Sequence, residues 1–109
     1  MAVFLHVTLE VKSAGMTRFV EAMGEAVPIL QSHGWVLVGA FVQRTGRLNT
    51  VIDLWQLEDF GHFDRGLKAL IADPRFAPIK AVLDETVDSE TIVFANALSY
   101  SPKEIPSPA

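Results

Sequence analysis

The feature that most constrains the fold of this chain is a change of hydrophobic period near residue 12. Residues 3–11 alternate strictly, and one face of this segment carries only apolar side chains, namely Val3, Leu5, Val7, Leu9 and Val11. Residues 16–30 instead place apolar side chains three and four positions apart. Alternation is typical of a half-buried β-strand, whereas the second spacing is typical of an amphipathic helix. The chain is therefore predicted to begin with a strand and a helix.

The ends of this first helix carry recognisable signals. Ser13 is a suitable N-cap because its hydroxyl can accept a hydrogen bond from a free backbone N–H. Pro28 lies inside the segment and its ring presses on the carbonyl of Gly24, so we expect a kink there. Gly34 is expected to end the helix in the left-handed conformation.

The next two segments are predicted to form a β-hairpin. Residues 35–44 and 49–57 have strand-like patterns, and residues 45–48 form a short connection between them. Gly39 interrupts the first of these strands, which indicates a bulge or a closely packed neighbour.

Two helical segments and a last strand complete the pattern. Glu58 and Asp59 would place two carboxylates at the positive end of the first of these helices. Its expected core stripe is Phe60, Phe63, Leu67, Leu70 and Ile71. A shorter helix is expected at residues 74–83 and a strand at residues 90–98. The tail, residues 99–109, contains three of the six prolines and is expected to be flexible or to pack on a partner subunit.

The order strand, helix, strand, strand, helix, strand predicts an α+β fold of the ferredoxin-like kind in residues 1–98. In this fold four antiparallel strands have the order 4-1-3-2, and the helices cover one face of the sheet. The other face would carry Phe4, His6 and Thr8, a mixture too apolar to leave exposed to water. We therefore expect a homodimer that forms through the helix-free sheet faces.

Composition excludes several classes of function. The chain has no cysteine, which removes disulfides and thiolate chemistry and fits a cytoplasmic protein. The net charge is −4, and the 9 basic residues are scattered, which argues against a nucleic-acid partner. No apolar run is long enough for a membrane span. The spacing of the three histidines predicts no metal site, and the lack of a phosphate-binding glycine loop predicts no cofactor.

Three sequence segments together resemble the NIPSNAP family, within the dimeric α+β barrel superfamily. They read G-R-L-N-T-V-I-D-L-W at residues 46–55, L-Q-S-H-G-W-V-L-V-G-A-F at residues 30–41 and A-L-I-A-D-P-R-F at residues 69–76. The resemblance implies a dimeric barrel architecture. It leaves the reaction open, because the superfamily contains cofactor-free monooxygenases, isomerases and haem-handling proteins as well as members without an assigned activity.

Asp53 is the first candidate for a catalytic residue. In the middle of a strand it would share a face with Val51, Trp55 and Leu57, which would remove water from the carboxylate and raise its pKa, as a general base requires. The alternative is an ion pair with a nearby arginine of the hairpin or with a partner chain.

His6 is the second candidate, because the first and third strands are neighbours in this topology. A His6–Asp53 pair could transfer protons. The alternative places His6 half-buried at a dimer interface. His62 is expected to face solvent, since its neighbour Phe63 belongs to the core stripe.

Aromatic and polar side chains suggest a site for a small hydrophobic or aromatic ligand. The candidate ligand-binding residues are Trp35, Arg47, Asn49, Trp55, Phe63 and Phe76. Ordinary core packing of the aromatics and a turn-stabilising role for the two polar residues are the alternatives. Three functions remain open: a ligand-binding protein, a cofactor-independent monooxygenase or isomerase that uses His6 and Asp53, and an interaction module without catalysis.

Overall fold

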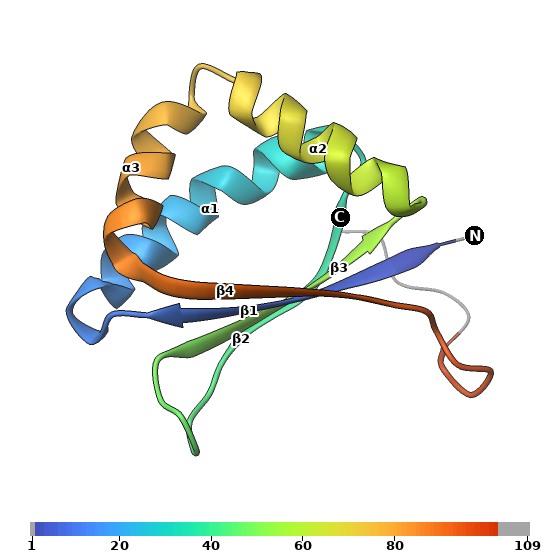
Figure 1. Cartoon of the computed structure of the whole chain (residues 1–109), viewed down its shortest axis with the longest axis horizontal. Helices are drawn as coiled ribbons and strands as arrows, with labels where there is room; N and C mark the ends of the chain where they lie inside the picture. Colours follow the sequence, from blue (N-terminus) through green and yellow to red (C-terminus); the bar gives the residue numbers. More distant parts are fainter. Residues whose placement is uncertain (1, 103–109) are drawn as a thin grey trace.

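The predicted order of strands and helices is confirmed by a computed structural model that describes residues 2–102 (Figure 1). A short 3₁₀ turn (Ser13–Gly15) precedes the first helix. The elements are β1 (Val3–Val11), α1 (Met16–Ser32), β2 (Val36–Val42), β3 (Thr50–Leu57), α2 (Phe60–Ala72), α3 (Phe76–Thr86) and β4 (Val87–Ala95).

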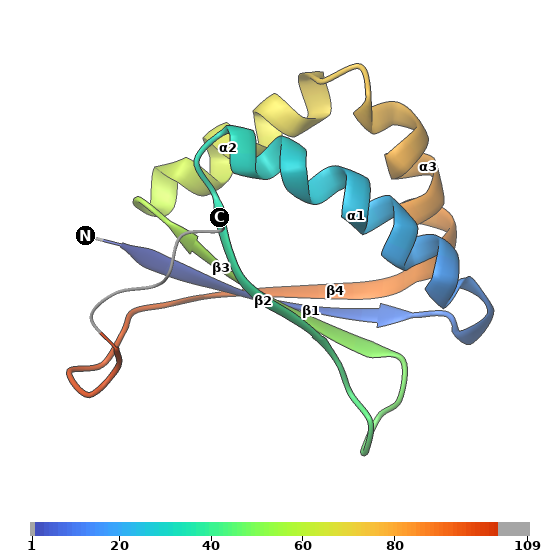
Figure 2. The same ribbon diagram turned by 180° about the vertical axis from the view of Figure 1, so that it is seen from behind.

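The four strands form one antiparallel sheet in the order β2-β3-β1-β4, which is the predicted order read from the opposite edge. Figures 1 and 2 show that α1, α2 and α3 all lie on the same side of this sheet. In the register, Val7 of β1 is opposite Asp53 on one side and Ile92 on the other. The chain therefore has an α+β fold with a two-layer arrangement.

The core lies between the helices and one face of the sheet. Burial alternates along β1, so that Leu5 is 1% exposed whereas the next residue, His6, is exposed. The same alternation along β3 confirms that Val51, Asp53, Trp55 and Leu57 point toward the helices. Because successive side chains of a strand point to opposite faces, this register also fixes which residues can meet.

The start of α1 differs from the expectation that Ser13 caps it. Gly15 is the N-cap position, and no side chain caps the helix there. The chain is held instead by the end of α3: the N–H of Lys12 donates to the carbonyl of Thr86 at 2.8 Å. A Cβ on Gly15 would lie 2.7 Å from Cγ2 of Thr86, so a close backbone approach replaces the cap. At the other end, Gly34 has the expected positive φ, 91°.

The expected core stripe of α2 is partly wrong. Phe60 and Ile71 are 58% and 68% exposed, whereas His62, expected to face solvent, is 4% exposed. The buried positions of α2 are His62, Gly66 and Leu70, each four residues after the last. The helix therefore turns His62 and Gly66 toward the core and leaves Phe60 and Ile71 exposed.

Hydrogen bonds explain why a histidine is buried here. The N–H of Glu58 donates to Nδ1 of His62 at 3.0 Å, which leaves the proton on Nε2 to donate to the carbonyl of His33 at 2.7 Å. The carbonyl of His62 in turn accepts a hydrogen bond from the indole N–H of Trp35 at 3.2 Å. A Cβ on Gly66 would lie 2.1 Å from that indole nitrogen, so only glycine allows the contact. His62 thus ties the end of α1 to α2.

The bulge expected at Gly39 is present in β2. Leu37 pairs with Trp55, and Gly39 pairs with Leu54, so Val38 is an extra residue in the strand. Beyond the bulge, Ala40 is opposite Asp53. The hairpin connection is longer than expected, because β2 ends at Val42 and β3 starts at Thr50.

The helix-free face of the sheet exposes apolar side chains beside His6. Val93 pairs with His6 and is 48% exposed, and Phe41, paired with Ile52, is 56% exposed. In the tail, Tyr100 is 85% exposed; residues 103–109, the rest of the predicted tail, lie outside the described residues. The helices within residues 2–102 do not combine the length and the hydropathy that a bilayer-spanning segment requires.

Candidate functional site

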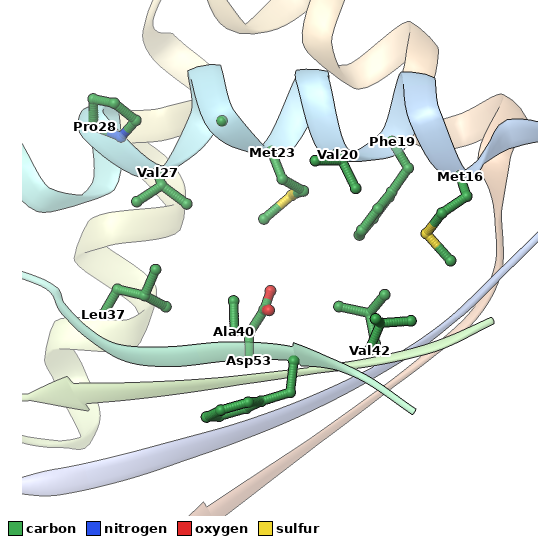
Figure 3. Close-up of a pocket in the computed structure, with 13 residues that line it drawn as sticks. Met16, Phe19, Val20, Met23, Val27, Pro28, Leu37, Ala40, Val42 and Asp53 are labelled. Atoms are coloured by element: carbon green, nitrogen blue, oxygen red, sulfur yellow. The ribbon is translucent and has the colours of Figure 1, made fainter. Parts of the chain in front are cut away.

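A cavity of about 490 Å³ lies between α1 and the sheet strands β2 and β3. Figure 3 shows five side chains of α1 that point toward the sheet: Met16, Phe19, Val20, Met23 and Val27. Leu37, Ala40 and Val42 of β2 and Asp53 of β3 form the opposite wall (Figure 3). The wall of the cavity is therefore almost wholly apolar.

Small residues help to keep this space open. Ala40 is the β2 residue directly opposite Asp53, so only a methyl group stands beside the carboxylate on that side. Gly24 of α1 also lines the cavity, and a Cβ placed there would meet no atom within 4 Å. Two positions at the exposed rim of the cavity thus carry small side chains that leave volume for a ligand.

Asp53 is the one ionisable group among the described residues that line this cavity. Its side chain is buried, with the residue 5% exposed. Burial raises the pKa of Asp53 to about 6, and the negative charge of Glu90 adds to the shift. Among residues 2–102 no hydrogen bond or ion pair of its side chain is found, so no protein group replaces the water that burial removes.

The expected alternative, an ion pair between Asp53 and a hairpin arginine, is not what the described residues form. Arg47 forms an ion pair with Glu10, and its side chain is 79% exposed. Asn49 adopts a positive φ of 64° in the connection before β3. Neither of these two predicted ligand-binding residues lines the cavities beside Asp53, because the hairpin connection projects away from the helices (Figures 1 and 2).

A second cavity, of about 210 Å³, lies deeper, between the sheet and helices α2 and α3. Asp53 and Met23 line both cavities, so the carboxylate stands in the wall between them. The four predicted ligand-binding aromatics, Trp35, Trp55, Phe63 and Phe76, all line this second cavity.

These aromatics also pack tightly on one another. The rings of Trp35 and Trp55 meet edge to face at 5.3 Å, and Trp35 stacks on Phe63 at 5.9 Å. Trp35 and Trp55 are 3% and 2% exposed. Core packing, the alternative reading of the sequence, therefore describes them well, and the second cavity is a gap within that core.

The structure does not bring His6 and Asp53 together. His6 pairs with Leu54, and its neighbour Val7 pairs with Asp53. Adjacent residues of a strand point to opposite faces, so Asp53 faces the helices while His6 lies on the helix-free face. The proposed His6–Asp53 proton-transfer pair is wrong for this reason, although the two strands are indeed neighbours.

Two parts of the site were missed in the sequence. The apolar stripe of α1 is not among the predicted ligand-binding residues, yet Met16, Met23 and their neighbours line the first cavity. Glu90 also lines the second cavity, and burial raises its pKa. Its position in a strand is predicted, but the face to which its side chain points is not, because residues 90–98 do not alternate apolar and polar side chains. Within residues 2–102 no group of three possible metal ligands is found.

Comparison with known proteins agrees with this fold. The model of the NIPSNAP family matches residues 6–102. A NIPSNAP family protein from Agrobacterium tumefaciens superposes with a TM-score of 0.85 at 19% identity, covering 95% of this chain and 100% of that chain. An uncharacterized NIPSNAP domain protein from Burkholderia xenovorans superposes with a TM-score of 0.79 at 21% sequence identity. The match covers 94% of this chain and 100% of that chain.

A more distant likeness is to SnoaB, a cofactor-independent oxygenase from Streptomyces nogalater. It has a TM-score of 0.67 at 16% identity, with 94% of this chain and 98% of that chain covered. At such identities the structural likenesses show a shared fold. A search of curated proteins finds no match. Because the family model spans nearly the whole sequence, this chain belongs to the NIPSNAP family.

Proposed function

We propose that this protein binds a small, largely apolar molecule in the cavity beneath α1 and that Asp53 accepts a proton from it. The observation that carries the proposal is the position of Asp53, a single desolvated carboxylate in an otherwise apolar wall. An ordinary core position would not hold an unpaired carboxylate, since burying one without a partner is costly.

The size and chemistry of the cavity support a ligand of this kind. Its volume, about 490 Å³, lies within the range of about 300–1,000 Å³ that is usual for small-molecule sites. Met16 and Met23 offer flexible, polarizable side chains that adapt to flat or irregular ligands. A ligand with an aromatic or aliphatic body and one acidic O–H or C–H group would match both the walls and the carboxylate.

The environment of Asp53 suits a general base. With its pKa raised to about 6, the carboxylate is ionised at neutral pH, yet it holds a proton far better than a solvated aspartate. Proton abstraction from an acidic group opens both isomerisation and cofactor-independent oxygenation. The fold shared with SnoaB is compatible with the second of these, and Asp53 would act without His6.

Binding can be tested with Nile red, a neutral apolar dye whose fluorescence reports its surroundings. Ala40 points into the cavity (Figure 3), so Ala40→Leu is expected to fill the space and weaken dye binding at least tenfold. Val36→Leu is the matched control, because Val36 pairs with Gln56 on the opposite face of the same sheet. Equal affinity of the Ala40→Leu variant and the wild type would place the dye elsewhere and refute the site.

The role of Asp53 can be tested on the same bound dye. We expect its emission to change with a midpoint near pH 6 in the wild type, because that is where the neighbouring carboxylate gains its proton. Asp53→Asn should still bind the dye and should lose this transition. A transition that persists in the variant would show that another group responds.

We also propose that the chain forms a homodimer through its helix-free sheet faces. The proposal is supported by the exposed apolar residues there, such as Val93 and Phe41, which are 48% and 56% exposed. Sedimentation at micromolar concentration should therefore give twice the mass of one chain. The lack of cysteine agrees with a reducing compartment such as the cytoplasm, which we keep as part of this proposal.

A further inference from the structure

Three cavities of the molecule lie in a row, and each adjacent pair has lining residues in common. One carboxylate belongs to each of these two shared walls. Asp53 lines both the cavity beneath α1 and the second, inner cavity. Glu90 lines both the inner cavity and a third, outer cavity of about 480 Å³ between α2, α3 and the start of β4. The two carboxylates thus mark the entrance and the exit of the inner cavity.

The sheet register explains this placement. Asp53 of β3 is opposite Val7, and Glu90 of β4 is opposite Leu9, on the two sides of β1. Val7 and Leu9 both face the helices, so both carboxylates belong to the helix-covered face. Two strand spacings and a two-residue offset separate their Cα atoms by roughly 12 Å. This separation is too long for a direct hydrogen bond and short enough for a chain of one or two water molecules between the carboxyl groups.

The inner cavity has room for such water. Its volume is about 210 Å³, and one water molecule needs only about 10–15 Å³ of such space. A water molecule in a mostly apolar cavity needs polar partners to remain there, and Asp53 and Glu90 supply four carboxylate oxygens.

We propose that Glu90 is the outer end of a proton relay that carries the proton taken up by Asp53 through the inner cavity to solvent. The inference rests on the proposed function, since it concerns the proton that Asp53 removes from a ligand. The bond from the proton to the ligand breaks, its electron pair stays on the ligand, and the proton bonds to an Oδ of Asp53. It then passes to water in the inner cavity, from water to Glu90, and from Glu90 to bulk water. Asp53 is left ionised and ready for another ligand.

A relay is needed because a bound ligand closes the other route. In the empty protein Asp53 can exchange protons with solvent through the cavity beneath α1. A ligand that fills this cavity blocks that path at the moment when Asp53 has just become protonated. The inner cavity lies on the other side of the carboxylate and remains available.

The charges along this path favour stepwise transfer. Burial raises the pKa of both carboxyl groups, and the charge of Glu90 raises the pKa of Asp53 further, so Asp53 takes up a proton more readily while Glu90 is ionised. Among the described residues, the walls of the first two cavities contribute no other ionisable group. The outer cavity adds three, Lys80, Asp84 and Asp88. Lys80 and Asp84 pair with each other at 2.6 Å, and Asp88 pairs with Lys12 at 3.7 Å, which leaves Glu90 as the carboxylate of this wall without an ion pair among the described residues.

The rate of proton arrival at Asp53 tests the relay. Nile red bound beneath α1 closes the direct route, and a laser-released caged proton supplies a fast drop in pH from about 7. In the wild type the dye emission should respond as Asp53 is protonated. In Glu90→Gln the response is expected to slow at least tenfold, while the thermal unfolding midpoint stays unchanged. The equilibrium midpoint should also fall, because one negative charge near Asp53 is gone, but this shift alone would follow from electrostatics without a relay.

Asp88→Asn is the matched control, since Asp88 lines the outer cavity but not the inner one. A slow response in Glu90→Gln together with a wild-type rate in Asp88→Asn supports the relay. Equal rates in the wild type and Glu90→Gln would overturn it, as would equal slowing by both substitutions, which would indicate general surface charge. Failure of the dye to bind, or a response that survives Asp53→Asn, would instead refute the proposed function on which the relay rests.

Discussion

The unpaired burial of Asp53 should make the protein less stable as pH rises, and Asp53→Asn should remove that effect. The pKa of Asp53 is about 6 in the folded chain, whereas an aspartate outside the fold has a pKa of 3.8. A difference of about 2.2 pKa units corresponds to about 3 kcal/mol of unfolding free energy. Because the folded-state pKa is the higher one, the folded protein favours the protonated form. The penalty is absent well below pH 3.8, grows up to about pH 6 and is complete above it.

Urea unfolding of the wild type and the variant at several pH values measures this effect. Asparagine does not titrate, so the free-energy difference between variant and wild type should rise by about 2 to 2.5 kcal/mol from pH 4 to pH 7, in favour of the variant. Any constant cost of placing an amide in this wall cancels in that comparison. A difference that does not change with pH would refute the claim that Asp53 is buried without a partner.

Asp73 provides a comparison of opposite sign. Hydrogen bonds from Arg75 lower the pKa of Asp73 to about 2, so its ionised form stabilises the folded chain above pH 4 and this contribution is lost as the pH falls toward 2. The free-energy difference between Asp73→Asn and the wild type should therefore stay nearly flat from pH 4 to pH 7, where the Asp53 effect develops.

Three further substitutions test the packing and the proposed dimer. Gly66→Ala should destabilise the fold by about 1–3 kcal/mol in urea unfolding, because its Cβ would lie 2.1 Å from the indole nitrogen of Trp35. Gly24→Ala, whose Cβ meets nothing within 4 Å, should stabilise the helix by up to about 1 kcal/mol, and a loss of stability there would contradict the open space described at that position. Val93→Glu should shift the sedimenting species from dimer toward monomer, whereas a wild-type profile would argue against association through the helix-free face.

The overall fold could be predicted from the sequence because alternation and helical spacing are strong and local. Residues 3–11 show this well, since their strict alternation agrees with the burial of β1. The burial of His62 could not be predicted, because it depends on the carbonyl of His33, which only the tertiary structure brings to the imidazole ring.

Only part of the candidate site could be predicted from the sequence. Asp53 could be identified, because a carboxylate among bulky apolar residues on one face of a strand stands out in the sequence. Its pairing with His6 is excluded by the same alternation: His6 lies opposite the apolar stripe of residues 3–11, whereas Asp53 lies on the apolar face of its strand, so the two side chains point to opposite faces. Glu90 could not be placed in this way, because residues 90–98 do not alternate apolar and polar side chains.

The single additional residue in β2 has a consequence for what relatives of this chain can bind. With Val38 inserted, Ala40 faces Asp53 and the ring of Phe41 turns to the opposite face, where it lies over Gly39. If β2 kept every residue but lacked the bulge, Val38 would pair with Leu54 and each later side chain of the strand would move to the other face. Phe41 would then take the place opposite Val51, and its benzene ring would occupy the space that a ligand needs. The bulge in this edge strand therefore decides whether a phenyl ring faces the helices, and so whether the site is open or closed.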